Sequence, residues 1–138
     1  MERGDNMAKY VYPAVFNEEK DGCISVFFPD LKGCSTFGHD IIDALAMAGD
    51  SLSLMLYDME EDGDDIPSPT PLQKIKTNGA EFASYISIDT MDYRKRFRNK
   101  AVKKTLSVPE WLNDSATAAG LNFSQILQEG LKHALNIA

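Results

Sequence analysis

Runs of β-branched and aromatic residues predict short strands in the first third of the chain, at residues 10–17, 23–28 and 34–37. Turn signals such as EEKDG at 18–22 separate these runs. Because connections this short join antiparallel neighbours, we expect a three-stranded meander. Apolar and polar residues alternate again at 81–89, which predicts a fourth strand.

Between the meander and the fourth strand, the hydrophobic period changes to that of a helix. Asp40 is placed as an N-cap before residues 41–59. The expected apolar stripe consists of Ile41, Leu45, Ala48, Leu52, Met55 and Met59, broadened by Ile42 and Leu56. This stripe should cover one face of the sheet, and Gly49 suggests close packing of the helix on a strand. The first 92 residues therefore predict a β-β-β-α-β domain.

The last part of the chain, residues 93–138, differs from the first in charge and in its order of predicted elements. A basic connector or short helix at 93–99 precedes a strand candidate at 100–108. Pro109 fits the first position of a helix that ends at Gly120. Asn122 and Ser124 are possible N-caps of a last helix. The order is strand, helix, helix.

One strand and two short helices cannot bury enough surface to fold alone, so we expect the tail to pair with a second copy. The predicted dimer core contains Leu106, Val108, Trp111, Leu112, Ile126, Leu127 and Leu131. Strand alternation then directs Lys103, Thr105 and Ser107 outward on a two-stranded ribbon. Side chains of these types hydrogen-bond base edges, and such a ribbon fits the major groove of DNA.

Charge is divided unevenly along the sequence. The net charge is −7, but residues 1–72 carry −11 and residues 73–138 carry +4. The run YRKRFRNKAVKK at 93–104 has seven Lys or Arg and no acidic residue. Such asymmetry indicates a nucleic-acid-binding end joined to a part with another task. Arg98, Lys100 and Lys104 are candidate contacts to DNA phosphates.

The tail resembles a ribbon-helix-helix DNA-binding domain, on the residues KKTLSVPEWL, Gly120 and NFSQILQEGL. The resemblance implies that Lys103, Thr105 and Ser107 read bases and that Asn122, Phe123 and Ser124 clamp a phosphate. Free N–H groups at a helix N-terminus also attract anions.

The front segment, with YPAVFNEEKDGCISVFFPDLKGCSTFG, IIDALAMAGDSL and DDIPSPTP, resembles the HicB family of antitoxins. This resemblance covers nearly the whole chain. It implies an α+β protein: a partial RNase H-like domain at 1–92 that blocks HicA, a small mRNA-cleaving ribonuclease, and a ribbon-helix-helix domain at 93–138 that dimerises and binds its own operator. A basic ribonuclease and an acidic front domain are electrostatically complementary.

Two alternatives remain open: a metal-dependent RNase H-like hydrolase, and a repressor without a toxin partner. The carboxylates of Asp21, Asp30 and Asp43 have no spacing that forces them together on two metal ions. We therefore expect no enzyme activity, no metal and no cofactor. Cys23 and Cys34 are interpreted as reduced thiols. The sequence predicts no membrane span and no signal peptide, and hence a cytoplasmic protein.

Overall fold

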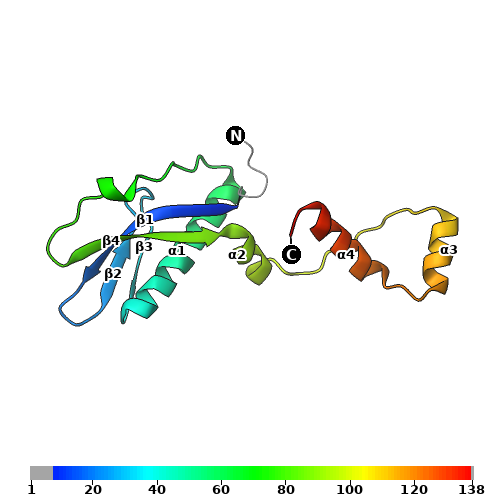
Figure 1. Ribbon diagram of the computed structural model, residues 1–138, viewed down its shortest axis with the longest axis horizontal. Coiled ribbons are helices and arrows are strands. Elements are labelled where there is room, and N and C mark those ends of the chain that lie inside the picture. Colours follow the sequence, from blue (N-terminus) through cyan, green and yellow to red (C-terminus); the bar gives the residue numbers. More distant parts are fainter. Residues whose placement is uncertain (1–7, 138) are drawn as a thin grey trace. The chain divides into compact units, whose positions relative to one another are not determined.

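Figure 1 shows the computed structural model of the chain, which describes residues 8–137. The expected absence of a signal peptide concerns an N-terminal segment that lies mostly outside the described residues. The chain forms two compact units, Met1–Asn99 and Lys100–Ala138, and each is described by itself.

The first unit contains a four-stranded sheet in the order β3-β2-β1-β4. Its strands are β1 (Lys9–Glu18), β2 (Ile24–Phe27), β3 (Ser35–Gly38) and β4 (Glu81–Asp89), and each neighbouring pair is antiparallel. The helix α1 (Ile41–Asp62) lies across one face of the sheet (Figure 1). The predicted order β-β-β-α-β is confirmed, and so is a mixed fold of helices and antiparallel strands.

The core lies between α1 and the sheet. Tyr12 and Phe16 of β1 and Val26 of β2 contribute buried side chains, and Leu52 and Leu56 of α1 pack against them. Even-numbered residues of β1 face the helix, as strand alternation requires.

Helix α1 begins as predicted, but its buried face is rotated from the expected stripe. The Asp40 carboxylate accepts a hydrogen bond from the Asp43 N–H at 2.8 Å. The buried residues are Ala44, Ala48, Leu52 and Leu56, with Met55 and Met59 partly buried beside them. Ile41, Ile42 and Leu45 are 42%, 78% and 44% exposed, so their expected place in the core was wrong.

Close backbone packing at Gly38 explains the rotation. A Cβ atom on Gly38 would lie 2.3 Å from the backbone nitrogen of Ala44. At its first turn the helix therefore touches the sheet through Ala44, and the larger side chains of Ile41, Ile42 and Leu45 are turned aside. The expectation that Gly49 marks the close approach was wrong, since a Cβ there would be 4.0 Å from Ile88, an ordinary contact.

After α1, residues 63–80 return to β4 through an extended segment that includes the short 3-10 helix η1 (Leu72–Lys74). The hydroxyl of Tyr12 donates to the carbonyl of Pro67. The Asp30 carboxylate accepts from the Thr70 hydroxyl at 2.5 Å and from its N–H at 2.9 Å. These contacts attach the proline-rich segment to the sheet.

Helix α2 (Thr90–Phe97) follows β4 directly and belongs to the first unit. Asp89 caps it by accepting from the Met91 N–H at 2.9 Å. Residues 93–97, which the sequence interpretation assigned to the tail domain, thus lie in a helix that packs on α1. The units divide after Asn99 for this reason.

The second unit contains α3 (Glu110–Ala118) and α4 (Phe123–Ala134), and neither has a buried residue. Gly120, at φ +70°, follows α3, and the N–H groups of Gly120 and Leu121 donate back to the Thr117 and Ala116 carbonyls. The prediction of a glycine stop is confirmed. Pro109 is the N-cap and not the first helical residue, because its ψ of 142° is extended.

Residues 101–109 form neither helix nor strand in the single chain. A strand is defined by hydrogen bonds to a neighbour, and the expected neighbour is a second copy. The strand at 100–108 therefore stays a prediction. Across residues 8–137, no helix has both the length and the apolar character needed to cross a membrane.

Candidate DNA-binding and dimer interface

The second unit exposes almost all of its large apolar side chains. Trp111 on α3 is 68% exposed and Leu131 on α4 is 54% exposed. The other predicted core residues are also accessible: Leu106, Val108, Leu112 and Ile126 are exposed, and Leu127 is half-buried. Helices this short are marginal in water unless their apolar faces are covered. The unit as it stands lacks a core.

The three predicted base-reading residues lie in the segment before α3. Lys103, Thr105 and Ser107 are all exposed. Among the described residues, none of the three has a side-chain hydrogen bond or ion pair, and nothing in the single chain fixes which way they point. Their role as a group on one ribbon face stays a prediction.

The N-terminus of α4 is open to an anion. Asn122 is the N-cap, and its side chain accepts from the Gln125 N–H at 3.0 Å. The Ile126 N–H already donates to the Asn122 carbonyl at 3.0 Å. The N–H groups of Phe123 and Ser124 precede the first intrahelical bond and point out of the helix end. This geometry suits the predicted phosphate contact, because the positive end of the helix dipole adds to these donors.

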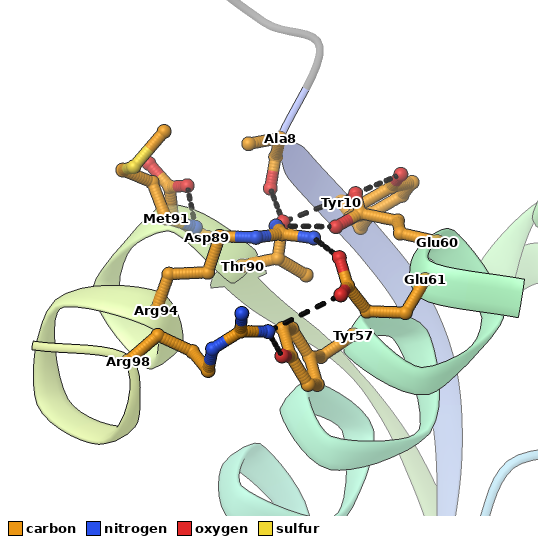
Figure 2. Close-up of polar contacts among 10 residues, drawn as sticks. All are labelled: Ala8, Tyr10, Tyr57, Glu60, Glu61, Asp89, Thr90, Met91, Arg94 and Arg98. Atoms are coloured by element: carbon orange, nitrogen blue, oxygen red, sulfur yellow. Dashed lines mark hydrogen bonds and ion pairs between the residues drawn. The ribbon is translucent and has the colours of Figure 1, made fainter. Parts of the chain in front are cut away.

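Part of the basic run is paired inside the first unit, as Figure 2 shows. Arg94 donates to Glu60 at 2.7 Å and to Glu61 at 2.9 Å. Arg98 donates to the Tyr57 hydroxyl and to Glu61 at 3.2 Å. Arg98, a predicted phosphate contact, thus has an acidic partner on α1. Lys100 and Lys104 are exposed and form no ion pair among the described residues.

These contacts shift the proton equilibria of the paired groups. The hydrogen bond from Arg94 lowers the pKa of Glu61 below its usual value, and Arg98 adds to this effect. The hydrogen bond to Glu60 raises the pKa of Arg94. The hydrogen bond to Tyr57 raises the pKa of Arg98. All three groups therefore stay charged at neutral pH.

We name the set Tyr57, Glu60, Glu61, Arg94 and Arg98 the α1–α2 polar cluster. Glu60 also accepts from the Tyr10 hydroxyl at 2.6 Å and from the Thr90 hydroxyl at 3.1 Å. The sequence does not predict this cluster, because its glutamates and its arginines lie on different helices, more than 30 residues apart. The sequence does contain an acidic run at 60–65 and a basic run at 93–104, which could have suggested an ion pair. Their spacing, however, does not indicate which acidic residue binds which arginine.

The three carboxylates considered as ligands for a hydrolytic metal centre, Asp21, Asp30 and Asp43, each bind a nearby backbone or side-chain group instead. Asp21 accepts from the Cys23 N–H at 3.0 Å, and Asp43 accepts from the His39 N–H at 2.8 Å. Asp30 binds Thr70, as described above. Within residues 8–137, no group of three or more His, Cys, Asp or Glu side chains lies close enough to hold a metal ion. Both cysteines are free thiols.

Residues 12–129 match the family described as HicB_like antitoxin of bacterial toxin-antitoxin system. A toxin-antitoxin complex from Streptococcus pneumoniae contains a chain that is 26% identical, with a TM-score of 0.58; the match covers 91% of this chain and 99% of that one. The antitoxin HicB of Burkholderia pseudomallei has the same fold at 16% identity, with a TM-score of 0.52 and coverage of 91% and 98%.

A curated relative comes from a bacteriophage. It is an uncharacterized 14.9 kDa protein from the rep-hol intergenic region of Haemophilus phage HP1. The two sequences are 26% identical over 102 residues, which span 74% of this chain and 75% of the phage protein.

Proposed function

This chain belongs to the HicB-like antitoxins of bacterial toxin-antitoxin systems, and from that membership we propose that it binds and inhibits a HicA-type, mRNA-cleaving ribonuclease toxin and represses its own operon. The match over residues 12–129 carries the proposal, since it extends through both units. In this role the protein acts in the cytoplasm and catalyses no reaction itself.

The first unit is the part we assign to the toxin, as a partial RNase H-like domain. It has its own core, formed by α1 and the sheet. Residues 1–72, which make up most of it, carry a net charge of −11. A ribonuclease needs a basic surface for RNA, so opposite charges favour the encounter of the two proteins.

The second unit is the part we assign to DNA, as a ribbon-helix-helix dimer. The exposure of Trp111 and Leu131 supports this assignment, because a second copy would cover both. Pairing of residues 100–108 from two chains would supply the missing strand neighbour. Leu106 and Val108 would then face the helices, and Lys103, Thr105 and Ser107 would face the bases.

Phosphate contacts complete the proposed DNA interface. The open N-terminus of α4 offers the N–H groups of Phe123 and Ser124, with Asn122 as the cap. Lys100 and Lys104 supply cations next to the ribbon. Arg98 would have to leave Glu61 to reach a phosphate, so we expect a smaller contribution from it.

The test of DNA binding uses the full chain and the promoter region that precedes its own reading frame. Thr105→Ala or Lys103→Ala should weaken specific binding by about 1–3 kcal/mol. The affinity should fall as salt is added. A plot of log K against log salt concentration should have a slope of about −0.9 for each phosphate neutralised. Lys74→Ala, which removes an exposed cation from the first unit, is the control. Affinity that ignores salt, or a chain that is monomeric by sedimentation, would contradict this part of the proposal.

The toxin assignment is tested separately. We expect the product of a short, basic neighbouring reading frame to copurify with the full chain. Its cleavage of mRNA should stop when the antitoxin is added in equimolar amount. Cleavage of RNA by the purified chain alone with Mg²⁺ or Mn²⁺, abolished by Asp→Asn changes, would instead support a hydrolase.

A further inference from the structure

The N-terminal half of β1 has a strand on one side only. On its β4 side, β1 is paired along nearly its whole length, from Lys9 to Asn17. On its other side, β2 pairs with β1 only from Val15 to Glu18. Among the described residues, no strand lies against this side of residues 9–14. A free strand edge presents unpaired backbone groups that another chain can use.

The register identifies these groups. The Thr90 N–H donates to the Ala8 carbonyl at 2.8 Å, which continues the pairing of β1 with β4. In an antiparallel ladder, successive residues direct their N–H and C=O groups to opposite sides. Even-numbered residues of β1 therefore bond β4, and Lys9 and Val11 direct both groups to the free side. Pro13 offers only its carbonyl there, because proline has no N–H.

A groove of about 560 Å³ runs along this edge, lined by residues 9–12 of β1 and residues 64–69 of the extended segment. The extended segment at 64–69, which lines the groove opposite β1, is fixed in place by two side-chain contacts. The Tyr12 hydroxyl binds the Pro67 carbonyl, and Asp30 binds Thr70. The groove is therefore open in the folded first unit, and a partner need not displace the segment first.

The groove is acidic. Asp64 and Asp65 are among the residues that line it, are exposed, and make no ion pair among the described residues. A second, separate hollow lies over the paired strands β1 and β4, and Asp89 and Asp92 line it. Among the described residues that line the two hollows, Lys9 is the only cation, and it stands against four carboxylates.

We propose that this groove takes an extended, Lys- or Arg-bearing segment of the basic toxin, added as a strand on the free edge of β1. The inference rests on the proposed function and specifies where the first unit would hold its partner. Backbone bonds to Lys9 and Val11 would align the segment. Alternate side chains of an added strand point to opposite faces, so a basic side chain at every second position can reach Asp64 and Asp65. Pro13 limits the pairing to a short stretch.

Amide hydrogen exchange on the full chain, with and without the purified toxin, tests the backbone contacts. The amides of Lys9 and Val11 should exchange rapidly in the free protein and become protected when the toxin is added. The amides of Tyr10 and Tyr12, which bond β4, should be protected in both samples and serve as internal controls. Unchanged exchange at Lys9 and Val11 in a toxin complex overturns the inference. Protection before the toxin is added also overturns it, because the edge then has another occupant.

Charge-neutral variants test the acidic residues that line the groove. Asp64→Asn with Asp65→Asn should weaken toxin binding by about tenfold at low salt and flatten its salt dependence. Asp50→Asn with Asp58→Asn removes the same charge from exposed positions on α1 and should bind as the parent does. Equal weakening of both pairs shows a general charge effect and overturns the docking site. A parent chain that does not bind the toxin refutes the proposed function itself, which separates the two failures.

Discussion

The guanidinium of Arg94 lies 2.7 Å from the carboxylate of Glu60, and this ion pair joins α2 to the last turns of α1. The Glu60 side chain is 17% exposed and that of Arg94 is 27% exposed, so water screens the pair only in part. Figure 2 shows that Tyr10 and Thr90 reach the same carboxylate. An arginine of the basic run at 93–104 thus binds α1 and holds the end of the first unit together.

Glu60→Gln should destabilise the first unit. The variant keeps the size of the side chain but removes the charge that Arg94, Tyr10 and Thr90 bind. Hydrogen bonds to charged groups contribute about 1.5–3 kcal/mol each, and we expect a loss of about 1–3 kcal/mol because glutamine retains some of them. Urea unfolding measures the change, with Glu61→Gln as the more exposed control. A larger loss for Glu61→Gln would contradict the central place of Glu60.

The stabilising effect of Glu61 should depend on pH. Arg94 lowers the pKa of Glu61 in the folded chain, so the unfolded chain binds the proton more readily. The contribution of Glu61 is then fully present above its unfolded-state pKa and is lost as the pH falls through the lower, folded-state pKa. The difference in unfolding free energy between the parent and Glu61→Gln should therefore shrink as the solution is acidified. A difference that stays constant down to acid pH would show that the ion pair has no role.

Glycine substitutions should have opposite effects at two positions. Gly38→Ala places a Cβ atom 2.3 Å from the Ala44 backbone nitrogen, so α1 must move away from β3. We expect a loss of about 1–3 kcal/mol or more. Gly49→Ala meets only Ile88 at 4.0 Å and should stabilise the helix by up to about 1 kcal/mol. Thermal unfolding of both variants checks the prediction, and a tolerated Gly38→Ala would refute the close approach.

Leu131→Asn should separate the proposed dimer. Leu131 is 54% exposed in the single chain and would be covered by the second copy. Loss of a buried leucine side chain costs about 2–5 kcal/mol, and each dimer loses two. Analytical ultracentrifugation should show monomers at concentrations where the parent is dimeric. Lys132→Asn alters the adjacent residue of α4 and should leave the dimer intact. Dimers that persist in Leu131→Asn would place the interface elsewhere.

Features that depend on neighbouring residues could be predicted from the sequence. Asp40 caps α1 because a carboxylate can reach an N–H three residues ahead, and this requires no knowledge of the rest of the fold. Gly120 stops α3 and Asn122 starts α4 for equally local reasons. The four strands of the first unit follow from alternation and turn chemistry in the same way.

Features that depend on contacts between distant segments could not be predicted. Periodicity indicated that α1 has an apolar side, but the contact of Gly38 with Ala44 decides which side is buried. The partner of Glu60 is Arg94, on another helix, and nothing in the charge pattern selects that pair. The base-reading role of Lys103, Thr105 and Ser107 supposes pairing between two chains, and it stays a prediction.

The missing core of the second unit has a consequence for how the protein responds to its own abundance. The core of the first unit, around Leu52 and Leu56, is complete within one chain, so this unit needs no second copy to fold. If the second unit gains its core only by pairing, mass action governs its folding. As the concentration of the chain falls, the dimer would dissociate and operator binding would be lost first. Single chains would still bind and inhibit the toxin through the first unit. Transcription of the operon would then resume before the toxin is released.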